Sequence, residues 1–345
     1  MRSTFSIGDR IVGENQSVFV VAEIGLNHNG SLEFAKQMIE AATTTGIDAV
    51  KFQTYKTEKY FHPSFAGYKQ RQQNELPYGW HTELMDLANS LGVEFFSTAY
   101  DENSVDFLDS LNVSCFKIAS SDCNNYSFMK YIARMGKPII LSTGFSGLDQ
   151  IEKAVRTIEE TGNDKLILLH CVSSYPLESK DINLSAIKTL RSAFKLPIGF
   201  SDHSVPESVL APIMATTLGA CVFEKHFTID QTLPGFDHKM SAMPEQMTRI
   251  VKQIREVELA LGDGSKRLMG SEFVRFESAH RSIYWRESYK KGTPVTEEMF
   301  IALRPGDGLS TEVVEMLVDK TLAIDTEPMK KVQMDHFDWT RRGIK

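Results

Sequence analysis

Eight short runs of apolar and β-branched residues recur along the first 227 residues, with amphipathic segments in most of the gaps between them. Near-continuous apolar strands separated by helices are typical of a parallel sheet that helices cover. Several of the strands follow a glycine by a few residues, as expected where a helix ends in a left-handed cap. The eight runs are Val18–Gly25, Asp48–Gln53, Val93–Ala99, Cys115–Ser121, Pro138–Gly144, Leu166–Ser174, Ile198–His203 and Cys221–Phe227.

The number of repeats selects the architecture within this α/β class. Eight β/α units that end near residue 262 predict a closed (β/α)8 barrel, the TIM barrel. A doubly wound open sheet is the alternative, but no strand is followed by a GxGxxG turn. Four of the connecting segments have clear helical patterns: Leu32–Thr45, Gly79–Leu91, Leu148–Thr161 and Pro244–Leu261.

The β/α repeat stops after Gly262-Asp263-Gly264, and from Arg281 the sequence changes to short strand-like runs and turns. We predict a barrel domain over 1–264, a linker over 265–280, and a small, mostly β domain over 281–345. The stretch 55–79, after the second strand, is long and polar, and loops of this length in a compact domain are usually functional or disordered. It is a candidate lid.

Composition excludes some classes of partner. A formal net charge of −7 over 345 residues argues against a general nucleic-acid binder. No apolar run approaches the roughly 20 residues of a membrane span, and the first residues do not resemble a signal peptide. The four cysteines, without CxxC spacing, fit buried small hydrophobes better than zinc or disulfide roles. We therefore expect a cytoplasmic protein.

Polar residues gather at the predicted carboxyl ends of the strands, where a barrel forms its active site. Side chains two apart along a strand share a face, so Lys51 pairs with Gln53, Ser201 with His203, and Glu224 with His226. Polar pairs that close otherwise apolar strands are hard to explain as packing. The other candidates at these ends are Glu23, Thr98, Lys117, Ser120, Ser173 and Tyr175, together with the segment Asn27-His28-Asn29-Gly30.

The two histidines predict a shared metal site. His203 and His226 end neighbouring strands at matching depth. Imidazole suits manganese, zinc, iron and other borderline cations, so the pair alone does not name the metal. Two protein ligands would leave coordination positions open for water and substrate, as Lewis-acid catalysis requires.

Two lysines lie inside apolar runs, where an unpaired charge is costly to bury. One interpretation of Lys51 and Lys117 is a salt bridge to Glu23 or Glu224. The other is a cationic site for a phosphate and a carboxylate, completed by neighbouring hydroxyls. A Schiff base on either lysine stays open as well.

At these residues the chain resembles the sialic acid (nonulosonic acid) synthase family. The matching strings include AEIGLNHNGSLEFAKQMIEAA, DAVKFQTYK, FKIASSDCNN, GKPIILSTG, LLHCVSSYP, IGFSDHS, FEKHFT and PGFDHKMS. The C-terminal domain resembles the antifreeze-like (SAF) module that follows the barrel in this family, with KKGTPVTEEMF and LRPGDG as its marks. The likeness covers nearly the whole chain.

The resemblance implies a transferase that condenses phosphoenolpyruvate with N-acetylmannosamine or a related 2-acetamido sugar, and that releases phosphate. It implies a divalent cation, Mn²⁺ first with Mg²⁺ or Co²⁺ as alternatives, and a homodimer with exchanged C-terminal domains. By position, His203 and His226 would hold the metal. The phosphoenolpyruvate residues would be Lys51, Thr98, Lys117, Ser120, Ser173 and Ser201, and the sugar residues Gln53, Tyr175, Asp237 and, from a partner subunit, Arg304.

Three carboxylates are catalytic candidates. Glu23 and Asp122 are the choices for handling the protons of the attacking water, and Glu224 is expected to orient a ligand or a substrate hydroxyl. Asp122 departs from the family, many members of which carry Glu there, so its reach is shorter by about 1.5 Å. Ser173 also departs, because some members have Asn at that position.

Three rival readings remain open. A related synthase acting on a phosphorylated sugar would need a second cationic pocket, for which the loops offer only Lys69 and Arg71. A metal-dependent sugar isomerase or epimerase would normally use more carboxylate ligands. A degenerate barrel with a sugar-binding or assembly module is the non-enzymatic reading, and for the C-terminal domain alone a dimerisation cap is an alternative.

Overall fold

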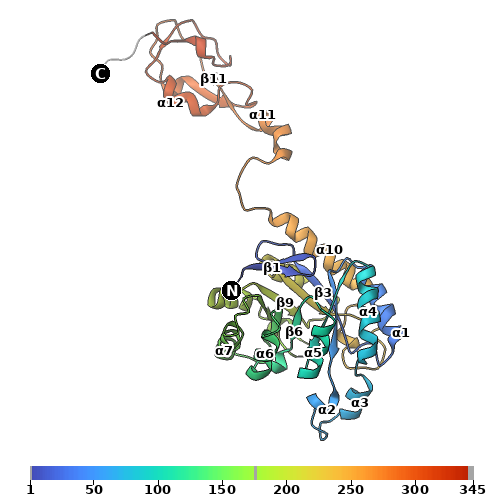
Figure 1. The fold of residues 1–345 in the computed structure, drawn as a ribbon. Coiled ribbons are helices and arrows are strands. Elements are labelled where there is room, and N and C mark those ends of the chain that lie inside the picture. The colour runs from blue at the N-terminus through green and yellow to red at the C-terminus, as the bar shows by residue number, and fades with distance from the viewer. Residues whose placement is uncertain (1, 175–176, 341–345) are drawn as a thin grey trace. The chain divides into compact units, whose positions relative to one another are not determined.

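The computed structural model describes residues 2–174 and 177–340, and the chain divides into two compact units, 1–263 and 264–345. The first unit is a closed barrel of eight parallel strands, in the order β10-β3-β4-β5-β6-β7-β8-β9 (Figure 1). The predicted barrel is thus confirmed. Its strands are β3 (Phe19–Gly25), β4 (Ala49–Thr54), β5 (Glu94–Ala99), β6 (Phe116–Ile118), β7 (Ile139–Ser142), β8 (Leu166–His170), β9 (Ile198–Asp202) and β10 (Val222–His226).

Helices follow the strands and cover the outside of the barrel (Figure 1). Their apolar faces pack on the sheet, so the main core lies between the helices and the strands. Glycines with positive φ precede most strands, as the cap pattern predicted, for example Gly46 at +81° and Gly162 at +84°. The helices are α1 (Leu32–Thr43), α4 (Tyr78–Ser90), α5 (Glu102–Ser110), α6 (Tyr126–Ala133), α7 (Leu148–Glu159), α8 (Ala186–Phe194), α9 (Leu210–Thr217) and α10 (Pro244–Leu261).

An N-terminal hairpin, which we did not predict, covers the amino-terminal end of the barrel. Its strands β1 (Thr4–Ile7) and β2 (Arg10–Gly13) pair across the two-residue turn Gly8-Asp9. Phe5, Ile7 and Val12 pack on the inner residues of the barrel strands. A short alternating run on either side of a Gly-Asp turn is the signal that would have identified it.

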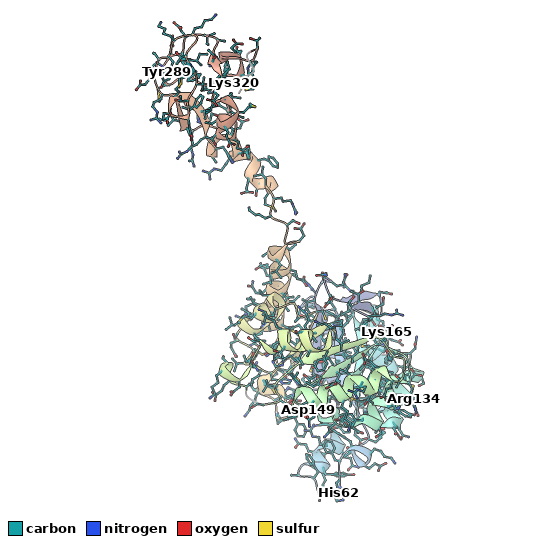
Figure 2. The ribbon with its side chains drawn as sticks, turned by 90° about the vertical axis from the view of Figure 1, so that its left-hand side faces the viewer. His62, Arg134, Asp149, Lys165, Tyr289 and Lys320 are labelled. Atoms are coloured by element: carbon teal, nitrogen blue, oxygen red, sulfur yellow. The ribbon has the colours of Figure 1, made fainter. Side chains whose placement is uncertain are left out.

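The segment 55–79 contains two short helices, α2 (Thr57–Tyr60) and α3 (Tyr68–Gln73). They project beyond the end of the barrel that lies opposite the hairpin (Figure 1), and His62 between them lies at the tip of the projection (Figure 2). We refer to residues 55–79 as the lid segment. It therefore contains two short helices where we predicted a long polar loop.

The second unit contains two small antiparallel sheets. One pairs β11 (Ser282–Trp285) with β12 (Phe300–Leu303), and the other pairs β13 (Thr321–Leu322) with β14 (Phe337–Asp338). Its core is centred on Trp285. Residues 265–280, predicted as a linker, belong to this unit and include the helical turns η4 (Gly270–Arg275) and α11 (Phe276–Ala279), while α12 (Val314–Leu317) follows later.

The four cysteines are free and buried, as expected. Across the described parts of the chain, no helix combines the length and apolar character needed to cross a membrane.

Candidate active site

A cavity of about 610 Å³ opens at the carboxyl end of the barrel strands, the end that carries the lid segment. Twelve of the fifteen predicted site residues line it. They are Glu23, Lys51, Gln53, Thr98, Lys117, Ser120, Ser173, Ser201, His203, Glu224, His226 and Asp237. The structure therefore brings together residues that span 215 positions of the sequence, from 23 to 237.

Strand register explains why these side chains meet. Across the closure of the barrel, His226 of β10 is opposite Glu23 of β3, and Glu23 is opposite Lys51 of β4. Neighbouring parallel strands bring such opposed residues within side-chain reach. On the other side of β10, Glu224 is opposite Ser201 of β9.

Lys51 is buried and paired with two carboxylates. Its Nζ lies 2.7 Å from Glu23 Oε2 and 3.5 Å from Glu224 Oε2, and it donates to Thr98 Oγ1 at 3.1 Å. Burial would lower the pKa of Lys51, but the two carboxylates outweigh burial and raise it. The salt-bridge interpretation therefore holds for this lysine, which is charged and already neutralised.

Glu224 is held as a carboxylate by the same network. Burial alone would raise its pKa, but Lys51 and Lys117 outweigh that effect and lower the pKa of Glu224 to about 2. Its Oε1 accepts a hydrogen bond of 2.9 Å from Ser201. Because its pKa is held low, Glu224 stays ionised and is placed to orient neighbouring groups.

Lys117 is the second buried lysine of the site, and among the described residues no carboxylate forms an ion pair with it, in contrast to Lys51. Its Nζ donates to Ser142 Oγ at 2.6 Å and to the carbonyl of Ile118 at 3.0 Å, both neutral oxygens. Burial lowers the pKa of Lys117, the charge of Glu224 partly opposes that effect, and the charge of Lys51 adds to it. A buried ammonium group with only neutral acceptors is stabilised by an anion, so this corner of the cavity is suited to a phosphate or carboxylate.

Hydroxyl groups surround that corner. Ser120 Oγ accepts from the amide of Gly144 at 3.1 Å and lies 3.2 Å from Cys171 Sγ. A Cβ on Gly144 would lie 2.3 Å from Ser173 Oγ and 2.8 Å from Ser120 Oγ, closer than real Cβ contacts allow. Glycine is thus required at 144 so that both serines can reach the cavity.

The two histidines lie together at the rim of the cavity, with ring centroids 5.7 Å apart. His203 Nδ1 lies 2.8 Å from the carbonyl of Val172, an acceptor, so Nδ1 carries the hydrogen and Nε2 has the lone pair. Burial, followed by the charge of His226, lowers the pKa of His203 to about 4, so the ring is neutral. A neutral imidazole oriented by a backbone carbonyl is the form that binds metals.

These donors fit a metal held by few protein ligands. No group of three or more His, Cys, Asp or Glu side chains suited to a metal occurs within 2–174 and 177–340. Asp237 Oδ2 lies 3.9 Å from His226 Nδ1, too far for a hydrogen bond. A cation here would therefore take two imidazoles from the chain and its remaining ligands from water and substrate.

Asp122 does not line the cavity. Its carboxylate accepts from Ser121 Oγ at 3.2 Å and from Asn125 Nδ2 at 3.3 Å. Ser121 does line the cavity and lies 3.2 Å from the hydroxyl of Tyr60. Burial raises the pKa of Asp122. The carboxyl group of Asp122 is therefore linked to the cavity only by its hydrogen bond with Ser121.

The segment Asn27-His28-Asn29-Gly30 after β3 has a supporting role that the sequence did not reveal. Asn27 is buried and donates to the carbonyl of Phe227 and to Ser241 Oγ, both at 2.8 Å. Ser241 in turn donates to the carbonyl of Asp237 at 2.7 Å. Asn27 thus ties the loop after β10, which carries Asp237, to the barrel.

The lid segment contributes lining residues that we did not single out as site residues. Tyr60, Phe61, Phe65 and Arg71 line the cavity, joined by Tyr100 after β5. The rings form a continuous cluster, with centroids 4.4 Å apart for Tyr60 and Tyr100 and 4.6 Å apart for Phe61 and Phe65. The aromatic residues of the lid segment were the sequence signal that could have identified these lining residues.

Two predicted sugar residues are not placed in this cavity. Tyr175 lies outside the described residues. Arg304 is exposed and follows β12 in the second unit. Its predicted role depends on a partner subunit and stays a prediction.

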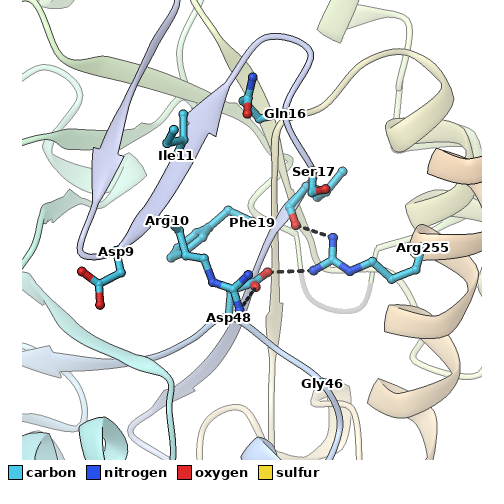
Figure 3. A pocket seen from close by; sticks show the side chains of 10 residues that line it. Asp9, Arg10, Ile11, Gln16, Ser17, Phe19, Gly46, Asp48 and Arg255 are labelled. Atoms are coloured by element: carbon cyan, nitrogen blue, oxygen red, sulfur yellow. Dashed lines mark hydrogen bonds and ion pairs between the residues drawn. The ribbon is translucent and has the colours of Figure 1, made fainter. Parts of the chain in front are cut away.

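A second cavity, of about 470 Å³, is lined by residues of the hairpin, of the barrel and of α10 (Figure 3). There Asp48 Oδ2 accepts from Arg255 at 2.8 Å and from the amide of Val20 at 2.8 Å, while Arg10 lies 3.4 Å from Oδ1. Arg255 also donates to the carbonyl of Val18. These groups satisfy one another and join the hairpin, the barrel and α10, so the contacts here are structural.

Comparisons with known proteins agree with this geometry. The NeuB family matches residues 38–266. The N,N'-diacetyllegionaminic acid synthase of Legionella pneumophila is 38% identical over 94% of this chain and 96% of its own length. The human N-acetylneuraminate-9-phosphate synthase is 32% identical over 97% of both chains. A crystal structure of the N-acetylneuraminic acid synthetase of Leptospira borgpetersenii, solved with citrate, has a TM-score of 0.75 and 35% identity over 79% of this chain and 95% of that one.

Proposed function

The chain belongs to the NeuB family, and from that premise we propose that it condenses phosphoenolpyruvate with a 2-acetamido sugar to give a nonulosonic acid and phosphate. The observation that carries the proposal is the contrast between the two lysines of the cavity. Lys51 is neutralised by Glu23 and Glu224, whereas Lys117 is buried against neutral oxygens. A small anion that carries both a phosphate and a carboxylate suits such an arrangement.

The anion would be held at the corner formed by Lys117 and the surrounding hydroxyls. We assign its contacts to Lys117, Ser120, Ser173 and Ser201, with Lys51 and Thr98 on the neighbouring strands. Gly144 keeps Ser120 and Ser173 close together there. The sugar would then occupy the space between the histidines and the lid segment, where Gln53 and Asp237 also line the cavity.

His203 and His226 are the residues that would hold a divalent cation, for which we propose Mn²⁺, with Mg²⁺ or Co²⁺ as alternatives. When bound, such a cation supplies Lewis-acid polarisation of the sugar's aldehyde. The chain's own contribution is to orient the imidazoles, which it does for His203 through the carbonyl of Val172.

Proton handling falls to the carboxylates. The new bond joins C3 of phosphoenolpyruvate to the aldehyde carbon, water then adds at C2, and the C2–O bond to phosphate breaks. The aldehyde oxygen gains a proton and the water loses its protons. We propose Glu23 as the group that takes a proton from water, because it lines the cavity, whereas Asp122 reaches it only through Ser121.

For the second unit we propose the antifreeze-like role, with Arg304 contacting the sugar's N-acyl group in a partner subunit. The proposal rests on the resemblance of LRPGDG and of the preceding strands, and on the exposure of Arg304. A homodimer with exchanged C-terminal units follows from it. As the setting for this chemistry we propose the cytoplasm.

The test is phosphate release from phosphoenolpyruvate by metal-stripped protein, with and without Mn²⁺, across a panel of 2-acetamido sugars. We expect release that needs both the metal and one class of sugar. No release with any sugar, free or phosphorylated, would overturn the proposal. Glu23→Gln and Asp122→Asn should be compared in the same assay, and a larger loss of kcat in Asp122→Asn would reverse our choice of proton carrier.

A further inference from the structure

Arg71 is a cation of the lid segment with an unusual setting. Its guanidinium lies over two aromatic rings, with Cζ 3.7 Å from the ring centroid of Phe236 and 5.5 Å from that of Phe61. Its Nε is buried and donates to no partner. Buried donors are nearly always satisfied in folded proteins, so a ligand is the natural acceptor for this one.

The position of Arg71 is fixed by contacts with neighbouring residues of the barrel domain. The backbone carbonyl of Arg71 accepts a hydrogen bond of 2.9 Å from the buried Tyr55, which anchors α3 to the end of β4. Phe236, against which the guanidinium stacks, directly precedes the cavity residue Asp237. A planar guanidinium held by stacking keeps its donors aimed in one plane, which lysine cannot reproduce.

The surroundings of Arg71 define the ligand chemistry. The lining residues beside it are the rings of Phe61, Phe65 and Tyr60. Among the described lining residues on the lid side, Arg71 is the one cation, and Lys69 on the same helix is exposed and does not line the cavity. One buried donor among apolar rings suits a neutral carbonyl next to a methyl group better than a phosphate dianion, which would need more cations to be desolvated.

We propose that Arg71, packed on Phe236, is a specificity residue that donates a hydrogen bond from Nε to the carbonyl oxygen of a second acylamino group at the far end of the sugar. The methyl of that group would pack on Phe61 and Phe65. The inference rests on the proposed function and narrows it: the substrate is a diacylamino sugar, rather than a sugar that ends in a free hydroxyl or in a phosphate.

Steady-state kinetics with three acceptors test this. The acceptors are N-acetylmannosamine, its 6-phosphate, and a 2,4-diacetamido-2,4,6-trideoxy sugar of the same ring configuration. For the unmodified enzyme we expect kcat/KM to be highest for the diacetamido sugar. In Arg71→Leu the ratio of kcat/KM between the diacetamido and the monoacetamido sugar should fall roughly 10- to 100-fold, the usual range for a lost hydrogen bond to a charged group. Most of the loss should be in KM for the sugar.

Two further variants complete the design. Arg71→Lys keeps the charge but loses the planar fork, so it should recover the ratio only in part. Lys69→Gln, on the exposed side of the same helix, is the matched control and should leave the ratio unchanged. Thermal denaturation of each variant checks that the fold is intact.

The outcomes separate the two proposals. An equal loss for all sugars in Arg71→Leu, or a preference for the 6-phosphate in the unmodified enzyme, would overturn the role of Arg71 and leave the synthase proposal standing. No phosphate release with any of the three sugars would overturn both. A collapse of the sugar ratio in Arg71→Leu, with partial recovery in Arg71→Lys, would support the inference.

Discussion

At the scale of single residues, the two cavity lysines show how burial and pairing separate groups of the same type. Lys51 forms ion pairs with Glu23 and Glu224, and Lys117 contacts only neutral oxygens. The sequence placed both lysines at strand ends, but it left the salt bridge and the anion site as alternatives for each. Their difference depends on the closure of β10 on β3, which brings Glu224 to Lys51 and which residue patterns do not reveal.

This contrast predicts opposite effects of removing each ammonium group. Lys51→Met leaves two buried carboxylates without their cation, so we expect a loss of about 3–5 kcal/mol in the free energy of unfolding. Lys117→Met removes a charge that burial disfavours, so stability should be unchanged or slightly higher, while KM for phosphoenolpyruvate rises roughly 10- to 100-fold. Urea denaturation and steady-state kinetics measure the two effects.

Lys188→Met, at an exposed position on α8, is the control for both measurements. If Lys117→Met were as destabilising as Lys51→Met, Lys117 would have a structural role and the assignment of the anion site would fail.

A second residue-scale prediction concerns pH. His81 is buried, and burial lowers its pKa to about 4. Its Nδ1 lies 3.1 Å from the carbonyl of Pro77, so Nε2 accepts from Thr54 Oγ1 at 2.8 Å. The folded-state pKa lies below the unfolded value of about 6.5, so the unfolded chain binds the proton first and stability falls as pH drops from 6.5 to 4.

His81→Gln removes that titration. The difference in unfolding free energy between the original protein and His81→Gln should therefore shrink by about 2 kcal/mol between pH 8 and pH 5. Urea denaturation at several pH values measures it, with His62→Gln, at an exposed histidine of the lid segment, as the control. A constant difference across this range would show that His81 takes up its proton equally well in the folded state.

At the scale of elements, the strands were predictable and the loops were not. All eight barrel strands lie where the apolar runs placed them, because burial on both faces leaves a continuous apolar signature. Seven of the eight observed strands are shorter than predicted, for example Phe116–Ile118 against the predicted Cys115–Ser121, and β4 has the predicted length. Arg71 could not be assigned from sequence because a lid segment has no periodicity that tells which side chains face a cavity.

The hydrogen bonds between Asn27, in the loop after β3, and the loop after β10 lead to a prediction at the scale of elements. Asn27→Ala removes both hydrogen bonds that the Asn27 side chain donates to the loop carrying Asp237. We expect KM for the sugar to rise about 5- to 20-fold, as for the loss of a buried hydrogen bond or two, with a much smaller change in KM for phosphoenolpyruvate. A merely structural role would change both constants together or neither. Asn89→Ala, exposed on α4, is the control.

At the scale of the whole molecule, the second unit has exposed apolar residues that do not belong to its own core. Around its first helical turns, Met269, Phe273 and Val274 are exposed, Val274 by 90%. Exposed apolar residues in close succession commonly mark a protein interface. Together with Arg304, they are consistent with the proposed exchange of C-terminal units between two subunits.

The exchange makes a definite prediction about mixed dimers. Lys117→Met disables the barrel of one chain, and Arg304→Ala disables the second unit of another, so each variant alone should have little activity. If Arg304 acts in the partner's site, a mixed dimer contains one site with an intact barrel and an intact arginine. Random pairing makes half of the dimers mixed, so about a quarter of the original activity should return on co-expression.

If Arg304 instead serves the barrel of its own chain, every site in the mixed dimer carries one defect and no activity returns. Light scattering would establish that both variants are dimers, and Phe273→Glu should shift the mass towards the monomer, whereas Ile11→Glu, also exposed but in the hairpin, should not. Dimers that give no recovery would exclude the contribution of Arg304 across subunits, because the assembly would be present and the shared site would not.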